Sequence, residues 1–101
     1  MLARVRGRSM QPTLAEGDLL LVRRRQVPVP GEVVALRLRE GIPVVKRVLR
    51  QDQAGWWVER DNPREGVDSW SVGAVPDTDL IGVVRVRLWP RPGRVSRLRR
   101  P

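Results

Sequence analysis

The sequence predicts a small all-β domain, with about five short antiparallel strands in a barrel-like arrangement. Nine prolines and nine glycines interrupt the 101-residue chain every few residues, which excludes long helices. Short apolar or alternating runs lie between these interruptions, and such runs are typical of strands. A chain of this length holds one modest core, which must be built from Val, Leu, Ile and four Trp because Phe and Tyr are absent.

Five segments carry the pattern of a strand. In residues 31–39, positions 34, 36 and 38 are apolar while 37 and 39 are arginine, so we expect a strand with one buried face. Residues 61–76 are rich in turn-forming residues and irregular. We expect one domain over residues 1–90 and a basic, disordered tail over residues 91–101. The expected strands cover residues 19–22, 31–39, 42–50, 56–60 and 80–89.

The absence of two residue types limits the chemistry that this chain can perform. It contains neither cysteine nor histidine. Disulfides, thiolate nucleophiles, Ser-His triads and the usual zinc sites are therefore excluded, and we expect no metal and no cofactor. Catalysis would have to use serine, threonine, lysine or carboxylates.

The charge of the chain favours anionic partners. Twenty basic residues oppose 11 acidic ones, which gives a net charge of +9. The sequence has no apolar run long enough to span a bilayer and no signal-peptide core at its start, so we expect a cytoplasmic protein. Arginine clusters such as Arg23–Arg25 would also allow peripheral contact with an anionic membrane, although a solvated arginine-rich face is the simpler interpretation.

The single lysine, Lys46, stands out because the other 19 basic residues are arginine. Arginine does not lose its proton at accessible pH, whereas burial can make a lysine neutral and hence a general base. To act near neutral pH, the pKa of Lys46 would have to fall from about 10.4 to roughly 7–8. The alternative is an ordinary outward-facing strand residue.

A serine in the segment GRSMQPTL, Ser9, is the candidate nucleophile. Alone it could equally be an ordinary loop hydroxyl. Together with Lys46 it forms the nucleophile–base pair that a chain without His or Cys can most readily build. Thr13 could serve in principle, but it follows a proline and has the features of a turn or cap residue.

Four segments in order resemble the signal peptidase I family, and together they extend over residues 4–90. RVRGRSMQPTLAEGDLLLV (4–22) resembles the nucleophile segment, and GEVVALR (31–37) the strand that follows it. PVVKRV (43–48) resembles the strand that carries the lysine base, and DNPREGVDSWSVGAVP (61–76) resembles the acidic segment. The resemblance implies the small antiparallel, barrel-like catalytic fold of that family and a serine endopeptidase activity.

The resemblance also implies roles for individual residues. Ser9 matches the nucleophile and Lys46 the general base, while Met10 matches a methionine beside the substrate pocket. The backbone amide of Ser9 is the main candidate donor to the oxyanion, because Gly7 stands where some members have a hydroxyl donor. Gly66 stands where the family often has a serine that hydrogen-bonds the lysine, so another group must orient Lys46.

A second group of matching residues would support the site rather than react. Arg47 follows the lysine, and Asp61, Asp68 and Ser69 match positions of the acidic segment. A carboxylate too close to Lys46 would raise its pKa and oppose its function as a base. We therefore expect Asp68 to face Arg47 or backbone amides instead.

The compact form resembles one subgroup, the nickel-type superoxide dismutase maturation proteases. This implies removal of an N-terminal leader from a precursor protein, with a nickel superoxide dismutase precursor as the candidate substrate. One alternative is a membrane-associated type I signal peptidase whose anchor lies outside this chain. Another is a non-catalytic basic β-domain that binds nucleic acid through exposed aromatic rings. We expect several tryptophans to lie in the core instead, and hence no specific nucleic-acid partner.

Overall fold

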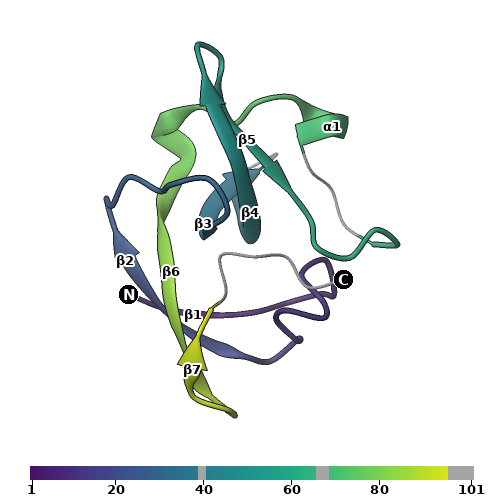
Figure 1. Cartoon of the computed structure of the whole chain (residues 1–101), viewed down its shortest axis with the longest axis vertical. Coiled ribbons are helices and arrows are strands. Elements are labelled where there is room, and N and C mark those ends of the chain that lie inside the picture. Colours follow the sequence, from purple (N-terminus) through teal and green to yellow (C-terminus); the bar gives the residue numbers. More distant parts are fainter. Residues whose placement is uncertain (39–40, 66–68, 96–101) are drawn as a thin grey trace.

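The computed structural model describes residues 1–38, 41–65 and 69–95, which form one antiparallel sheet of seven strands (Figure 1). The strand order is β1-β2-β6-β3-β4-β5, and β7 pairs with β6. This architecture confirms the predicted all-β class. The strands are β1 (Leu2–Arg4), β2 (Leu19–Arg24), β3 (Val33–Leu38), β4 (Ile42–Asp52), β5 (Gly55–Glu59), β6 (Leu80–Trp89) and β7 (Gly93–Arg94).

The five strands expected from the sequence are β2 to β6, and two short strands were missed. β1 and β7 have three and two residues, which is too short for a periodic pattern. They exist because the neighbouring strands β2 and β6 offer pairing partners. Between β5 and β6 the described residues form α1 (Ser69–Val72) and the 3₁₀ turn η2 (Asp77–Asp79).

The centre of the sheet is covered on both faces. Val33 and Ala35 of β3 belong to one core cluster, and Val34 and Leu36 belong to another. The expectation of a strand with a single buried face was therefore wrong for this part of β3, because apolar side chains cover both of its faces. The first core contains Val5, Met10, Leu14, Leu20, Val22, Val33, Ala35 and Val84, and the second contains Val34, Leu36, Val48, Trp56, Val58, Val75 and Val83.

Strand β6 connects the two halves of the sheet. It lies between β2 and β3 and pairs with both, with Leu20 opposite Arg87 and Val34 opposite Val83. The β1–β2 hairpin is thereby joined to the β3–β4–β5 meander. Figure 1 shows β4 and β5 in the upper part of the view, with β1 and β2 below and β6 running between the two groups.

The tryptophans contradict the expectation that several of them lie in the core. Trp56 is buried, whereas Trp70 and Trp89 are 64% and 56% exposed. Two of the rings instead contact arginines: the guanidinium carbon of Arg50 lies 4.7 Å from the ring centroid of Trp57, and Arg4 approaches Trp89 at 5.8 Å. Trp56 is the one tryptophan in the core clusters of the described residues. The nucleic-acid alternative requires exposed aromatic rings, and Trp70 and Trp89 are such rings.

The expected tail contributes at its start to the sheet. Gly93 and Arg94 form β7 opposite Arg87 and Val86. Residues 96–101 of that tail lie outside the described residues. No helix within the described ranges is long and apolar enough to cross a membrane.

Candidate active site

The loop that carries Ser9 connects β1 to β2 and is anchored by two buried side chains. Met10 and Leu14 insert into the first core, and the amide of Leu14 donates to the carbonyl of Met10 at 2.9 Å. Ser9 is half-buried between the exposed Arg8 and the buried Met10. The hydroxyl-bearing residue therefore lies at the boundary between core and solvent, on a backbone that the core holds in place.

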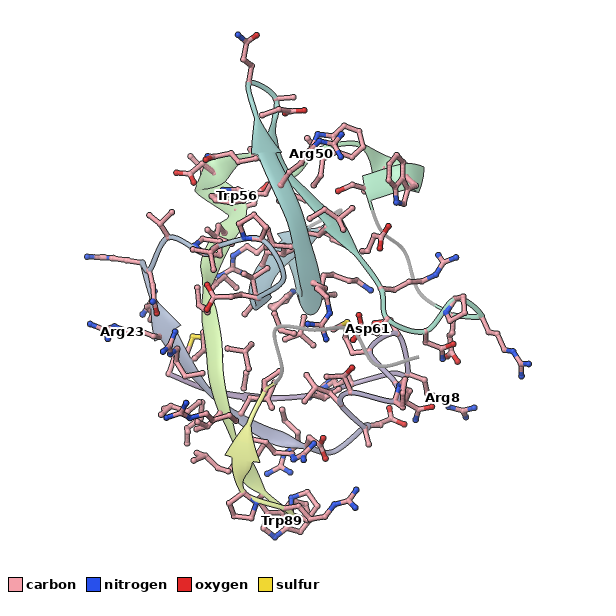
Figure 2. All side chains as sticks on the ribbon, viewed as in Figure 1. Arg8, Arg23, Arg50, Trp56, Asp61 and Trp89 are labelled. Atoms are coloured by element: carbon pink, nitrogen blue, oxygen red, sulfur yellow. The ribbon has the colours of Figure 1, made fainter. Side chains whose placement is uncertain are left out.

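Asn62 holds the two peptide groups that flank Ser9. Its amide donates to the carbonyl of Ser9 at 2.8 Å, and its Nδ2 donates to the carbonyl of Arg8 at 2.9 Å. Figure 2 shows the neighbouring Asp61 beside the loop that carries Arg8. Sequence reasoning missed Asn62 as a site residue, because in the context DNP it has the features of a turn residue. Its position directly after Asp61 was the available signal.

Lys46 lies within β4, where it is opposite Val34 of β3 and only 3% exposed. The interpretation of an outward-facing strand residue is therefore wrong. Burial of an amine disfavours its charged form. The position of the only lysine of the chain thus meets the first physical requirement for a general base.

Arg47, the next residue, makes a bidentate ion pair with Asp61. Its Nε and Nη2 donate to Oδ1 and Oδ2 of Asp61 at 2.9 and 2.6 Å, and both side chains are almost fully buried. Nη1 donates to the carbonyl of Gly31 at 2.8 Å, and the hydroxyl of Thr13 donates to Asp61 Oδ2 at 2.5 Å. This network joins β4, the turn before β3, the segment after β5 and the loop that carries Ser9.

Gly7 adopts a backbone conformation that favours glycine. Its φ is +79°, and a Cβ built there would meet no atom within 4 Å. A side chain would therefore fit in space but would strain the backbone. The amide of Gly7 donates to Oε2 of Glu16 at 2.9 Å. The conformation gives a physical reason for glycine at this position.

The remaining predicted residues have separate positions. Ser69 begins α1 and is buried, and its Oγ accepts a hydrogen bond from the amide of Val58 at 2.9 Å. This bond ties α1 to β5. Asp68 and Gly66 lie outside the described residues.

A cavity of about 730 Å³ lies beside β1 and the first half of β4. Gly7, two residues before Ser9, is part of its wall, whereas the side chain of Met10 is buried in the first core. Within the described residues, β1 pairs on one side with β2, and β5 pairs with β4 only from Arg47 onward. The walls are mostly apolar and consist of Met1, Leu2, Ala3, Arg4, Val5, Arg6, Gly7, Ala35, Pro43, Val44, Val45 and Ile81.

Residues 1–85 match the Peptidase S24-like family. The chain belongs to this family. The match to the Peptidase S24-like family includes the loop that carries Ser9, strand β4 with Lys46, and the Asp61–Asn62 segment. It supports a peptidase. A comparison with curated proteins gives no match. No group of three or more potential metal-ligating side chains occurs in the part of the chain that the structure describes.

Proposed function

We propose that this Peptidase S24-like protein is a serine endopeptidase in which Ser9 is the nucleophile and Lys46 is the general base. The observation that carries the proposal is the burial of the only lysine, at 3% exposure, in the strand next to β3. A buried amine tends to be neutral, and a neutral amine can take a proton from a hydroxyl. The family match supports the same reaction class.

The proposed reaction has two halves. Neutral Lys46 takes the proton of Ser9 Oγ while Oγ bonds to the carbonyl carbon of the substrate, and the resulting oxyanion accepts a hydrogen bond from the Ser9 amide. The Lys46 ammonium then gives its proton to the leaving amide nitrogen as the C–N bond breaks. Lys46 next takes a proton from water, which attacks the acyl-enzyme and releases Ser9 with its proton restored.

The contacts around the two residues act by positioning. Asn62 holds the carbonyls of Arg8 and Ser9, while Thr13 links the same loop to the Arg47–Asp61 ion pair beside Lys46. When the protein holds the nucleophile in the reactive geometry, conformational entropy does not have to be lost again in each turnover. In this proposal the buried ion pair is therefore structural support for the reacting groups.

The substrate of the proposed reaction is an extended polypeptide in the cavity beside β1. The cavity ends near Gly7, and β1 leaves one backbone edge without a strand partner among the described residues. A peptide can add to such an edge through backbone hydrogen bonds while apolar pockets take its side chains. We propose that the cut removes an N-terminal leader from a precursor, with a nickel superoxide dismutase precursor as the first candidate.

The test compares wild type, Ser9→Ala and Lys46→Arg on a nickel superoxide dismutase precursor and on a signal-peptide substrate. We expect wild type to cleave one of them at a single bond, which sequencing of the new N-terminus identifies. Its rate should increase with pH as Lys46 loses its proton. Cleavage by either variant at the wild-type rate would exclude the dyad. The control is a circular dichroism spectrum of each variant, which should show that the variant is folded.

A peripheral membrane setting is the second candidate, and exposed apolar and basic side chains on β1, β2 and β6 favour it. Leu2 is opposite Leu21 on β1 and β2, both side chains are exposed, and the exposed Trp89 lies on the adjacent β6. Arg4 beside Trp89 and the exposed arginines at 23–25 add positive charge. Exposed Leu, Trp and Arg side chains suit the surface of an anionic bilayer. Flotation with anionic vesicles tests this setting, and vesicles that fail to bind at low salt would contradict it.

A further inference from the structure

A second, smaller cavity of about 310 Å³ shares no lining residue with the proposed substrate cavity beside β1. One wall is the loop that follows Ser9, and the other is the turn between β6 and β7. None of its wall residues belongs to the proposed dyad. The lining residues are Pro12, Thr13, Leu14, Arg87, Arg91, Arg94 and Val95.

The cavity has an excess of positive charge. Three of its wall residues are arginines, and the neighbouring carboxylate is that of Asp18, whose Oδ2 lies 3.4 Å from Arg87 Nη1. Arg91 and Arg94 form no side-chain hydrogen bond or ion pair with any residue that the structure describes. Three guanidinium groups and one carboxylate thus give the cavity a net charge of two positive charges.

Arg87 is held in place at the wall of the cavity. Its Nε donates to the carbonyl of Arg91 at 2.8 Å, and its Nη1 donates to the carbonyl of Thr13 at 3.3 Å. These two bonds and Asp18 fix the guanidinium, which is 24% exposed. A fixed arginine loses little conformational entropy on binding a ligand, unlike a freely moving surface arginine.

We propose that this cavity binds a phosphate group through Arg87, Arg91 and Arg94. Planar guanidinium groups donate paired hydrogen bonds to phosphate oxygens, and arginine is the usual residue for this contact. A volume of about 310 Å³ is at the lower end of the range of small-ligand sites, so it can hold a phosphate group with a small attachment. The acidic Asp18 is neutralised by Arg87 and therefore repels the ligand less.

The cavity also shares a residue with the network near the proposed dyad. The carbonyl of Thr13 accepts from Arg87, while its hydroxyl donates to Asp61, the partner of Arg47. Among the described residues, the bonds to Arg91, Thr13 and Asp18 use Nε and Nη1 of Arg87, so Nη2 can contact a phosphate group while these bonds persist. A ligand bound at Arg87 would therefore act on the loop that carries Ser9 through Thr13, whose carbonyl is bonded to Arg87.

The test is a calorimetric titration of the full chain with inorganic pyrophosphate at constant ionic strength. We expect Arg91→Ala and Arg94→Ala each to weaken binding about tenfold, because each removes a charge-assisted contact. Arg23→Ala is the matched control, since it removes one exposed arginine from β2, and it should change the affinity less than about twofold. Absence of binding, or an equal loss in the Arg23 variant, would overturn the proposal.

The phosphate group could belong to a soluble compound or to an anionic lipid, and a second arm separates these sources. The full chain is mixed with phosphatidylglycerol vesicles and with phosphatidylcholine vesicles, with and without excess pyrophosphate. Selective binding to phosphatidylglycerol that pyrophosphate reverses, and that Arg91→Ala weakens, assigns the cavity to a lipid headgroup. Vesicle binding that pyrophosphate does not change assigns it to a soluble phosphate compound, since the titration has already established the cavity as the site.

Discussion

Two arginine–carboxylate pairs show how differently this chain uses its most frequent cation. Arg47 and Asp61 meet at 2.6 Å with side chains that are almost fully buried, and their donors and acceptors connect four segments. Arg85 and Glu32 meet at 3.5 Å, with Arg85 44% exposed. Exposed pairs contribute about 0–1 kcal/mol, whereas removing one partner of a buried pair costs about 3–5 kcal/mol. The environment of an arginine, more than its presence, determines its contribution.

The largest effect, a loss of cleavage activity, is expected when the proposed base Lys46 is replaced by arginine, the cation found elsewhere in the chain. Lys46→Arg keeps a basic side chain of similar length but replaces the proposed neutral amine with a guanidinium that does not lose its proton. We expect the cleavage rate to fall roughly 10⁴-fold or more, as in other nucleophile–base pairs. Steady-state kinetics at several pH values measure this. The reciprocal control is Arg23→Lys on β2, and a loss of similar size there would contradict the assigned role of Lys46.

Breaking the buried pair is expected to have the next largest effect. Asp61→Asn leaves the buried Arg47 with an uncompensated charge and should reduce the free energy of unfolding by about 3–5 kcal/mol. Glu32→Gln removes the same charge from the exposed pair and should cost less than about 1 kcal/mol. Urea denaturation of both variants makes the comparison, and equal losses would show that burial of the ion pair is not the decisive factor.

The positioning role of Asn62 gives a smaller effect. Asn62→Ala removes the Nδ2 donor to the carbonyl of Arg8 and leaves the backbone bond to Ser9. We expect kcat to fall about tenfold with little change in KM, because the serine loop is less well held. The stability of the variant is measured in parallel. A change in KM alone would indicate a contact with substrate instead.

A substitution at Gly7 measures the cost in stability of backbone strain alone, because the added side chain meets no steric conflict. Gly7→Ala adds a Cβ that meets no atom within 4 Å at a φ of +79°. The cost should therefore be about 1 kcal/mol, from the left-handed conformation alone. Thermal unfolding measures it, with Gly93→Ala as the control, because its Cβ also meets nothing and its φ is not in the left-handed region. Equal costs would contradict the role of the backbone conformation.

The smallest effect concerns the exposed tryptophans and the nucleic-acid alternative. The rings of Trp57 and Trp70 lie 5.6 Å apart beside Arg50. If these rings stack on bases, Trp70→Ala should weaken binding of single-stranded DNA or RNA by at least about fivefold. We expect weak, salt-sensitive binding that this substitution changes less than about twofold, as a gel-shift titration would show.

The strands could be predicted from the sequence because their alternation is local, and the site could be predicted only in part. The burial of Lys46 was one of two alternatives that the apolar segment PVVKRV permitted. The two-sided burial of β3 depends on segments distant in sequence, so no local period could reveal it. The contacts of Asn62 with Arg8 and Ser9 span more than 50 residues, and nothing in a turn sequence identifies such a partner.

The position of β6 has a consequence for synthesis of the protein. Ser9 belongs to the N-terminal hairpin and Lys46 to the following meander, and the strand that pairs with both units begins at Leu80. A nascent chain adds residues from the N-terminus, so both halves emerge from the ribosome before the strand that joins them in the sheet. The complete sheet therefore forms only after β6 has been synthesised, which delays assembly of the proposed dyad until that strand has emerged.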